Sequence, residues 1–287
     1  DLQQATEHRS FPPVVSIFFG GGTPSLFSPG AIQKILDWID AIMPITSSCE
    51  ITLEANPGTL ETEKLSGFCQ AGINRLSLGV QSFHQPSLQA LGRIHTAETA
   101  YSACSTALSL DFNSVNIDLM FGLPQQTEAT ALKDLDRAIQ TGCQHISWYE
   151  LTIEPNTLFA HKPPQRPDAD TRAHWTALGQ KHLAAAGFNQ YEVSAFCQPG
   201  FICQHNTWIW SFGDYLGIGA GAHSKLTNAK EHIRLVRYRH PTTYIDRPNK
   251  VEIQTCIKPH ELPFEFLLNR LRIMQPIAWE TAQTFAG

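Results

Sequence analysis

Polar residues recur at the ends of apolar segments, in a pattern that suits a site for a small charged ligand. The apolar run 14–19 is followed by Gly20, Gly21, Gly22 and Thr23. Because glycine has no Cβ, this turn can bring backbone N–H groups against a polar ligand group. The polar residues at or near the ends of later apolar runs are Glu54, Gln81, Asp118 and Glu150.

A cationic residue, Arg93, follows the third of these runs within the segment 91–95. Backbone amides, carboxylates, a side-chain amide and a guanidinium together suit a zwitterionic ligand that carries a ribose. The carboxylates would accept hydrogen bonds from an ammonium group and from sugar hydroxyls, and Arg93 would bind a carboxylate with two parallel hydrogen bonds.

Each of these side chains also has a purely structural interpretation. Glu54 precedes Ala-Asn-Pro-Gly and could hydrogen-bond that turn, and Arg93 could belong to a surface ion pair. Asp118 lies in the middle of an apolar run, where burying a carboxylate is costly unless it is paired. A functional role is therefore favoured for Asp118.

The elements that must position these residues alternate along the chain. We expect strands at 14–19, 50–54, 74–80, 115–121, 145–151 and 191–196. Helical patterns separate them, such as Ile32, Ile35, Leu36 and Ile39 after the capping residue Ser28. This alternation predicts an α/β fold with a parallel sheet that curls into a partial barrel, and a doubly wound open sheet is the competing architecture. In a βα barrel the carboxyl ends of the strands carry the chemistry.

The domain organisation follows from where this alternation stops. We expect a barrel core over residues 1–226, a connecting arm over 227–262, and the start of a small, mainly helical C-terminal domain over 263–287. The chain begins with Asp1 and ends inside a helical pattern, so we expect a fragment of a longer protein.

Composition narrows the class of protein. The 287 residues are 42% hydrophobic and 16% charged, which is typical of a soluble globular protein, and the net charge of −5 argues against a nucleic-acid partner. No apolar run approaches the roughly 20 residues that span a bilayer, and no signal peptide is visible. Seven scattered cysteines suit reduced thiols in a cytoplasmic protein.

Five motifs, in this order, resemble the oxygen-independent coproporphyrinogen III oxidase family of radical S-adenosylmethionine proteins. They are the segments 19–25 (Phe-Gly-Gly-Gly-Thr-Pro-Ser), 54–58, 79–83, 91–95 and 116–124. The segments 153–159 and 213–219 are more specifically similar to the heme chaperone branch of that family. The resemblance covers essentially the whole chain and implies a partial βα barrel with a small C-terminal domain.

The resemblance also implies cofactors and contacts. S-adenosylmethionine would be bound by Gly21, Gly22, Thr23, Glu54, Gln81, Arg93 and Asp118, with His223 lining the pocket through its backbone. A 4Fe–4S cluster, in the full-length parent, and heme are the other cofactors that it implies.

A second candidate site is the segment 203–210, Cys-Gln-His-Asn-Thr-Trp-Ile-Trp, which resembles the HNxxYW motif of the chaperone branch with Ile209 where the family favours Tyr. The resemblance makes His205 an axial heme ligand, with the two tryptophans packed on the porphyrin. Alternatively, His205 only fixes a loop. A zinc site from Cys197, Cys203 and His205 is disfavoured by the spacing.

One departure from the family pattern concerns the cluster. Radical S-adenosylmethionine proteins hold it with three cysteines spaced CxxxCxxC, and no such triplet occurs here. The cluster loop would precede Asp1, so we expect no metal site in this chain and no cleavage of the cofactor by it.

The sequence is compatible with three candidate functions. The favoured one is a heme chaperone that passes heme to acceptor proteins and makes transient contact with membrane proteins. The second is an oxygen-independent coproporphyrinogen III oxidase, which shares the barrel site. The third, a βα-barrel enzyme whose glycine turn binds phosphate, has thin support because Arg93 is the one cation near that turn in the predicted site.

Overall fold

The chain folds into two compact units that each combine segments far apart in sequence. The computed structural model describes residues 1–7, 11–59, 62–228 and 231–286. The barrel unit comprises Val15–Trp38 and Ser47–Ile202, and the terminal unit comprises Asp1–Val14, Ile39–Thr46 and Cys203–Gly287.

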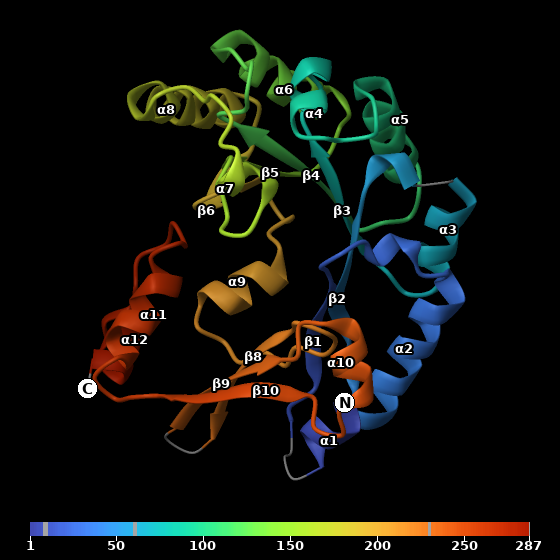
Figure 1. Cartoon of the computed structure of the whole chain (residues 1–287), viewed down its shortest axis with the longest axis vertical. Coiled ribbons are helices and arrows are strands. Elements are labelled where there is room, and N and C mark those ends of the chain that lie inside the picture. The colour runs from blue at the N-terminus through green and yellow to red at the C-terminus, as the bar shows by residue number, and fades with distance from the viewer. Residues whose placement is uncertain (8–10, 60–61, 229–230, 287) are drawn as a thin grey trace. The chain divides into compact units, whose positions relative to one another are not determined.

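The barrel unit is built on a curved sheet in which most strands are parallel (Figure 1). The sheet has seven strands in the order β1-β2-β3-β4-β5-β7-β6. Their bounds are β1 Val14–Phe19, β2 Ile45–Ala55, β3 Arg75–Gln81, β4 Ser114–Phe121, β5 His145–Glu150, β6 Asn189–Glu192 and β7 Ala195–Cys197. The pairs β2–β3, β3–β4 and β4–β5 are parallel, so their carboxyl ends lie along one edge. The predicted α/β partial barrel is confirmed.

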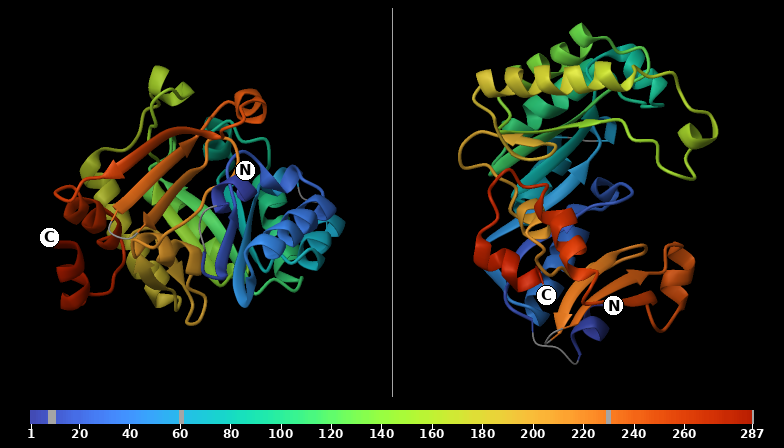
Figure 2. Two further views of the ribbon diagram at one scale, coloured as in Figure 1. Left: turned by 90° about the horizontal axis from the view of Figure 1, so that it is seen from below. Right: turned by 90° about the vertical axis from the view of Figure 1, so that its left-hand side faces the viewer.

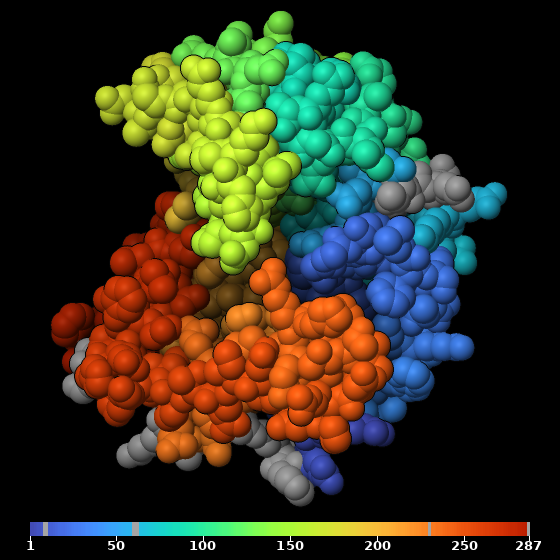
Figure 3. Space-filling model, viewed as in Figure 1, coloured from blue at the N-terminus to red at the C-terminus, as the bar shows by residue number. Residues whose placement is uncertain are grey.

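Helices cover the outer side of this sheet (Figure 1). They are α2 Pro29–Ile42, α3 Thr62–Gln70, α4 Gln85–Ala90, α5 Ala97–Leu108, α6 Glu128–Gln140 and α8 Ala169–Ala185. Several begin where the sequence places an oxygen-bearing cap: Thr96, Thr127 and Asp168 each accept a hydrogen bond from the backbone N–H three residues on. The long connection from β5 to α8 contains α7 (Leu158–His161) and lies on the surface, yellow-green in Figure 3.

The sheet ends in a hairpin that the sequence did not predict. One strand was expected over 191–196, but β6 and β7 are two short antiparallel strands, and β7 also pairs antiparallel with β5. The chain reverses at Val193 and Ser194, which carry no glycine or proline signal for a turn. The strands are too short to show alternation.

The terminal unit contains a second sheet of three strands, which lie side by side (Figure 2). The strands β8 His223–Asn228, β9 Glu231–Arg237 and β10 Val251–Ile257 are antiparallel in the order β10-β9-β8. Thus the expected connecting arm contains two strands and the helix α10 (Pro241–Asp246). Residues 252–256 of β10 are all exposed, so the strand lacks the alternation by which buried strands are predicted.

The remaining helices of the terminal unit are α1 Leu2–Thr6, α9 Gln204–Trp210, α11 Leu262–Arg270 and α12 Trp279–Ala286. A small core of this unit joins Phe212, Ile257 and Phe266, with Phe285 stacked on Phe266 at 4.3 Å between ring centroids. Among the described helices of both units, none combines the length and apolar character that crossing a membrane requires.

Candidate functional site in the barrel unit

The glycine turn after β1 lies against the carboxylate of Glu54 at the end of β2. The backbone N–H of Gly21 donates to Glu54 Oε2 at 3.1 Å. Gly21 and Gly22 have φ values of +75° and +54°, and a Cβ on either would meet nothing within 4 Å. The turn therefore requires glycine for its left-handed backbone rather than for lack of space. Glu54 therefore accepts a hydrogen bond from the turn after β1. The structural interpretation had it bond the Ala-Asn-Pro-Gly turn that follows it in sequence.

Two carboxylates lie near one another in the site. Burial raises the pKa of Glu54, the Gly21 N–H opposes that rise, and the charge of Asp118 adds to it. Burial likewise raises the pKa of Asp118, against hydrogen bonds from Asn116, Ser147 and Ser77. The carboxylate has hydrogen-bond partners within the sheet, since Ser77 Oγ donates to Asp118 Oδ2 at 3.0 Å. Two adjacent carboxylates favour a ligand with a positive charge or several hydrogen-bond donors.

Gln81 ends β3 in a strained backbone conformation. Its φ is +69°, although it has a Cβ, and such residues cluster at binding sites. The Tyr149 hydroxyl donates to Gln81 Oε1 at 2.9 Å, which leaves the two amide hydrogens directed elsewhere. A Cβ on Gly79 would lie 3.1 Å from Gln81 Nε2 and 3.2 Å from Asn56 Oδ1, so the glycine makes room for both amides.

Arg93 reaches the same region from the loop after α4. One guanidinium nitrogen donates to Asn56 Oδ1 at 3.3 Å. Of the ion pairs between described residues, none includes Arg93, so the surface ion-pair interpretation has no support there. The charge of Arg93 lowers the pKa of the Tyr149 hydroxyl. Arg93 therefore lies near the phenol on which Asp118 and Glu54 also act.

Tyr149 is the site residue that the sequence analysis missed. Burial, Asp118 and Glu54 all raise the pKa of its hydroxyl, and Arg93 and the bond to Gln81 lower it. The polar residue that the sequence pattern indicated at the end of this strand is Glu150. However, Glu150 accepts a hydrogen bond from Arg172 Nε of α8 at 2.6 Å. Successive residues of a strand point to opposite faces of the sheet, so Glu150 lies on the face opposite to that of Tyr149.

A buried carboxylate on α6 holds the loop that follows Gln81. Asp134 accepts hydrogen bonds from Ser82 Oγ at 2.6 Å, from the Phe83 N–H at 2.7 Å and from Gln126 Nε2 at 3.3 Å. Burial raises the pKa of Asp134 to about 6. Because Ser82 follows β3 and Gln126 follows β4, the Asp134 side chain links the two loops that come after these strands.

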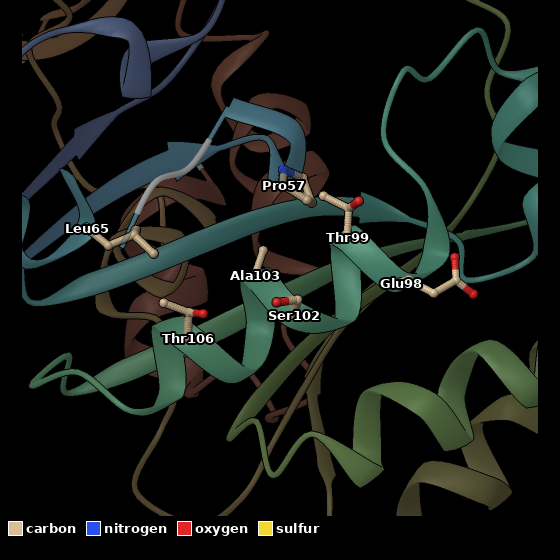
Figure 4. A pocket seen from close by; sticks show the side chains of 7 residues that line it. All are labelled: Pro57, Leu65, Glu98, Thr99, Ser102, Ala103 and Thr106. Carbon is tan, nitrogen blue, oxygen red and sulfur yellow. The ribbon is translucent and has the colours of Figure 1, made fainter. Parts of the chain in front are cut away.

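A separate cavity of about 400 Å³ lies on the helical side of the barrel unit (Figure 4). Its lining residues are Pro57, Leu65, Glu98, Thr99, Ser102, Ala103 and Thr106. None of these lining residues belongs to the predicted ligand site, and none of them is a lysine or arginine that could bind an anionic ligand. This cavity is therefore separate from the group of predicted residues at the strand ends.

Comparison with known proteins identifies the family. The model of the radical SAM superfamily matches residues 2–138. The heme chaperone HemW of Escherichia coli K12 is 46% identical over 278 residues, which are 96% of this chain and 73% of that protein. The HemW of Haemophilus influenzae is also 46% identical, over 100% of this chain and 75% of its own length. This chain belongs to the heme chaperone HemW family.

The HemW-family assignment confirms the resemblance that the motifs indicated. The fold agrees as well. The solved structure of coproporphyrinogen III oxidase (HemN) from E. coli superposes with a TM-score of 0.81 at 19% identity, covering 96% of this chain and 67% of that one. At that identity the likeness shows the shared fold alone.

Two residues predicted for ligands in this HemW-family chain belong to the terminal unit. His205 is half-buried in α9, and His223 is exposed at the start of β8. A Cβ on Gly217 would lie 2.1 Å from the His223 carbonyl oxygen, so that backbone is tightly packed. Both assignments stay predictions. Gly21, Glu54, Gln81, Arg93 and Asp118 are the predicted residues that the barrel unit brings together, with Gly22 and Thr23 next in the turn.

The cysteines of the chain do not fit an iron–sulfur cluster. All seven are free thiols, and five of them are buried. Burial raises the pKa of the Cys104 and Cys143 thiols to about 12, whereas a metal-binding cysteine must lose its proton. Among described residues no group of three or more His, Cys, Asp or Glu could hold a metal ion.

Proposed function

We propose that this chain binds S-adenosylmethionine in the barrel unit and heme through the terminal unit, as the core of a heme chaperone. The names of its relatives support heme transfer to acceptor proteins as the task of the whole protein. A cytoplasmic site of action, with transient contact to membrane proteins that receive heme, completes the proposal.

The observation that carries the proposal is the meeting of two carboxylates, an amide and a guanidinium around Tyr149. This donor set fits a zwitterion attached to a ribose. Arg93 would bind the ligand carboxylate, and Glu54 and Asp118 would accept hydrogen bonds from its ammonium group and hydroxyls. The Gly21–Thr23 turn would border the ligand through its backbone.

The 4Fe–4S cluster belongs to the proposal for the full-length protein only. Three thiolates would have to come from outside the present sequence, because no CxxxCxxC triplet occurs in it. We therefore assign no step to the cluster here.

The heme proposal is supported by the surroundings of His205. On the same helix Trp208 is 46% exposed and donates through Nε1 to the Asp214 carbonyl at 2.7 Å. Trp210 carries the Arg272 guanidinium over its ring at 4.3 Å. An exposed indole and an imidazole on one short helix suit the face and the iron of a porphyrin.

The barrel site is tested by calorimetric titration of this chain with S-adenosylmethionine and, separately, with methylthioadenosine, which lacks the amino-acid group. We expect Arg93→Ala to weaken S-adenosylmethionine binding about tenfold or more and to leave methylthioadenosine binding unchanged, since a charge-assisted pair contributes about 1.5–3 kcal/mol. Equal loss for both ligands, or for neither, contradicts the carboxylate clamp.

The heme site is tested by absorbance titration. We expect His205→Ala to shift or abolish the Soret band of bound heme, and His260→Ala, which removes an exposed histidine of the same unit, to leave it unchanged. Identical spectra reject His205 as a ligand. Conversion of coproporphyrinogen III by the anaerobically reconstituted full-length protein, without heme binding, would support the oxidase instead.

A further inference from the structure

A chain of hydrogen-bonded side chains runs through the interior of the barrel unit and ends at Asp118. It begins at Tyr191 on β6, whose hydroxyl lies 2.8 Å from His145 Nε2 on β5. His145 Nδ1 lies 2.6 Å from Asn116 Oδ1 on β4. Asn116 Nδ2 donates to Asp118 Oδ1 and to Ser77 Oγ, both at 2.8 Å.

The direction of each hydrogen bond follows from the carboxylate. An ionised carboxylate only accepts, so Asn116 must present its NH₂ group to Asp118 and its oxygen to His145. His145 must then carry its proton on Nδ1, which makes Nε2 the acceptor of the Tyr191 hydroxyl. Every donor in the chain therefore points toward Asp118.

The imidazole in this chain is neutral. His145 is fully buried, and burial and the nearby positive charge of Arg75 hold its pKa well below the usual value. A neutral imidazole can orient a neighbour only through its tautomer. The Asn116 oxygen fixes that tautomer by requiring a proton on Nδ1, and the Tyr191 hydroxyl then donates to Nε2. Ser147 Oγ lies 3.1 Å from Asn116 Oδ1 and also neighbours the Asp118 carboxylate.

Asp118 itself is held on both oxygens but is not enclosed. Ser77 holds Oδ2 and Asn116 holds Oδ1, and the residue remains partly exposed. A carboxylate has about four acceptor positions, so positions remain for a ligand. The two bonds fix the plane in which those remaining positions lie.

We propose that His145 and Asn116 are positioning residues that hold the Asp118 carboxylate in its ligand-binding orientation, with the Tyr191 hydroxyl supporting the Nδ1-protonated tautomer of His145 by donating to Nε2. The proposal rests on the proposed function, because it takes Asp118 as a contact to S-adenosylmethionine. It adds three residues that touch no ligand and extends the site from β4 to the hairpin at the sheet edge.

The first experiment measures the tautomer. Nitrogen-15 spectra of histidine-labelled chain, with the His145 signals assigned by comparison with His145→Asn, should show a neutral ring protonated on Nδ1 between pH 6 and 8. The charged and titratable neighbours of this ring and of Asp118 include Arg75, Tyr191, Glu54 and Tyr149, and Arg93 acts on Tyr149. A ring protonated on Nε2 overturns the proposal.

The second experiment measures affinity for S-adenosylmethionine by calorimetry. Tyr191→Phe should lower it about threefold to tenfold, the effect of one hydrogen bond. His145→Leu should lower it at least as much. His145→Asn should restore most of it, because the Asn amide nitrogen occupies the place of Nδ1 and can donate to Asn116. Rescue by Asn but not Leu separates positioning from simple core packing.

The control is Tyr101→Phe, which removes a hydroxyl of the same unit from a tyrosine packed on Arg137. It should bind like the wild type. Unchanged affinity in Tyr191→Phe and His145→Leu overturns the positioning role. If the wild type fails to bind S-adenosylmethionine, the proposed function fails, whereas the nitrogen-15 spectra still decide the hydrogen-bond chain.

Discussion

The Tyr149 hydroxyl and the Gln81 amide form a 2.9 Å hydrogen bond across 68 residues of sequence. They extend from β5 and β3, which lie on either side of β4 in the sheet. Both side chains must therefore face the same side of the sheet, where Asp118 of β4 also faces. This bond shows which face of the sheet carries the site.

Tyr149→Phe should weaken S-adenosylmethionine binding by about 0.5–1.5 kcal/mol, the usual contribution of one hydrogen bond. The ring stays in place, but the Gln81 amide loses the group that fixes its orientation. Calorimetric titration measures the loss. Glu150→Gln, one residue along the strand, should bind normally, and equal effects of the two changes would place Tyr149 outside the site.

Gln81 offers a way to separate backbone strain from ligand contact. Gln81→Gly and Gln81→Ala both remove the amide, so both should weaken S-adenosylmethionine binding to a similar degree. Only glycine relieves the φ of +69°, and the left-handed conformation costs an L residue about 1 kcal/mol. Urea unfolding should find the Gly variant more stable than the Ala variant by about that amount. Equal stabilities would mean that the turn is not strained.

The raised pKa of Asp134 predicts that the stability of the protein depends on pH. Its pKa rises from 3.8 to about 6 on folding, so between those values the folded state binds more protons than the unfolded state. The free energy of unfolding therefore falls as the pH rises through this range. Relative to Asp134→Asn, the wild type should gain about 1 kcal/mol of stability between pH 7.5 and pH 5. Urea unfolding of both proteins at the two pH values measures it, and a constant difference contradicts the raised pKa.

Much of the site was predictable because the strands are parallel and follow one another in the sheet. Once the alternation of strands and helices predicts a βα fold, the polar residues that follow each apolar run must gather at one edge. Glu54 and Gln81 could be placed together in this way, and Asp118 stood out because a carboxylate within an apolar run is costly to bury. The motif resemblance then suggested S-adenosylmethionine as the ligand that we propose.

Other parts could not be predicted, for definite physical reasons. At the end of β5, Tyr149 and Glu150 face opposite sides, and only the pairing register with β4 decides between them. His145 and Asn116 look like ordinary strand residues until the neighbouring strands bring them together. The strand β10 is mostly exposed and lacks apolar alternation, so its place in a sheet depends on pairing with β9.

Gly179 tests how closely α8 packs on the sheet. A Cβ at this position would lie 2.0 Å from two atoms of the buried Trp148 ring on β5, so the helix and strand leave no room for a methyl group. Gly179→Ala should lower the free energy of unfolding by about 1–3 kcal/mol, although alanine is the better helix former. The control is Gly30→Ala in α2, where a Cβ meets nothing within 4 Å and the change should be neutral or stabilising. Thermal and urea unfolding compare the two. If Gly179→Ala is as stable as Gly30→Ala, Trp148 must be able to move aside, and α8 is not fixed by this contact.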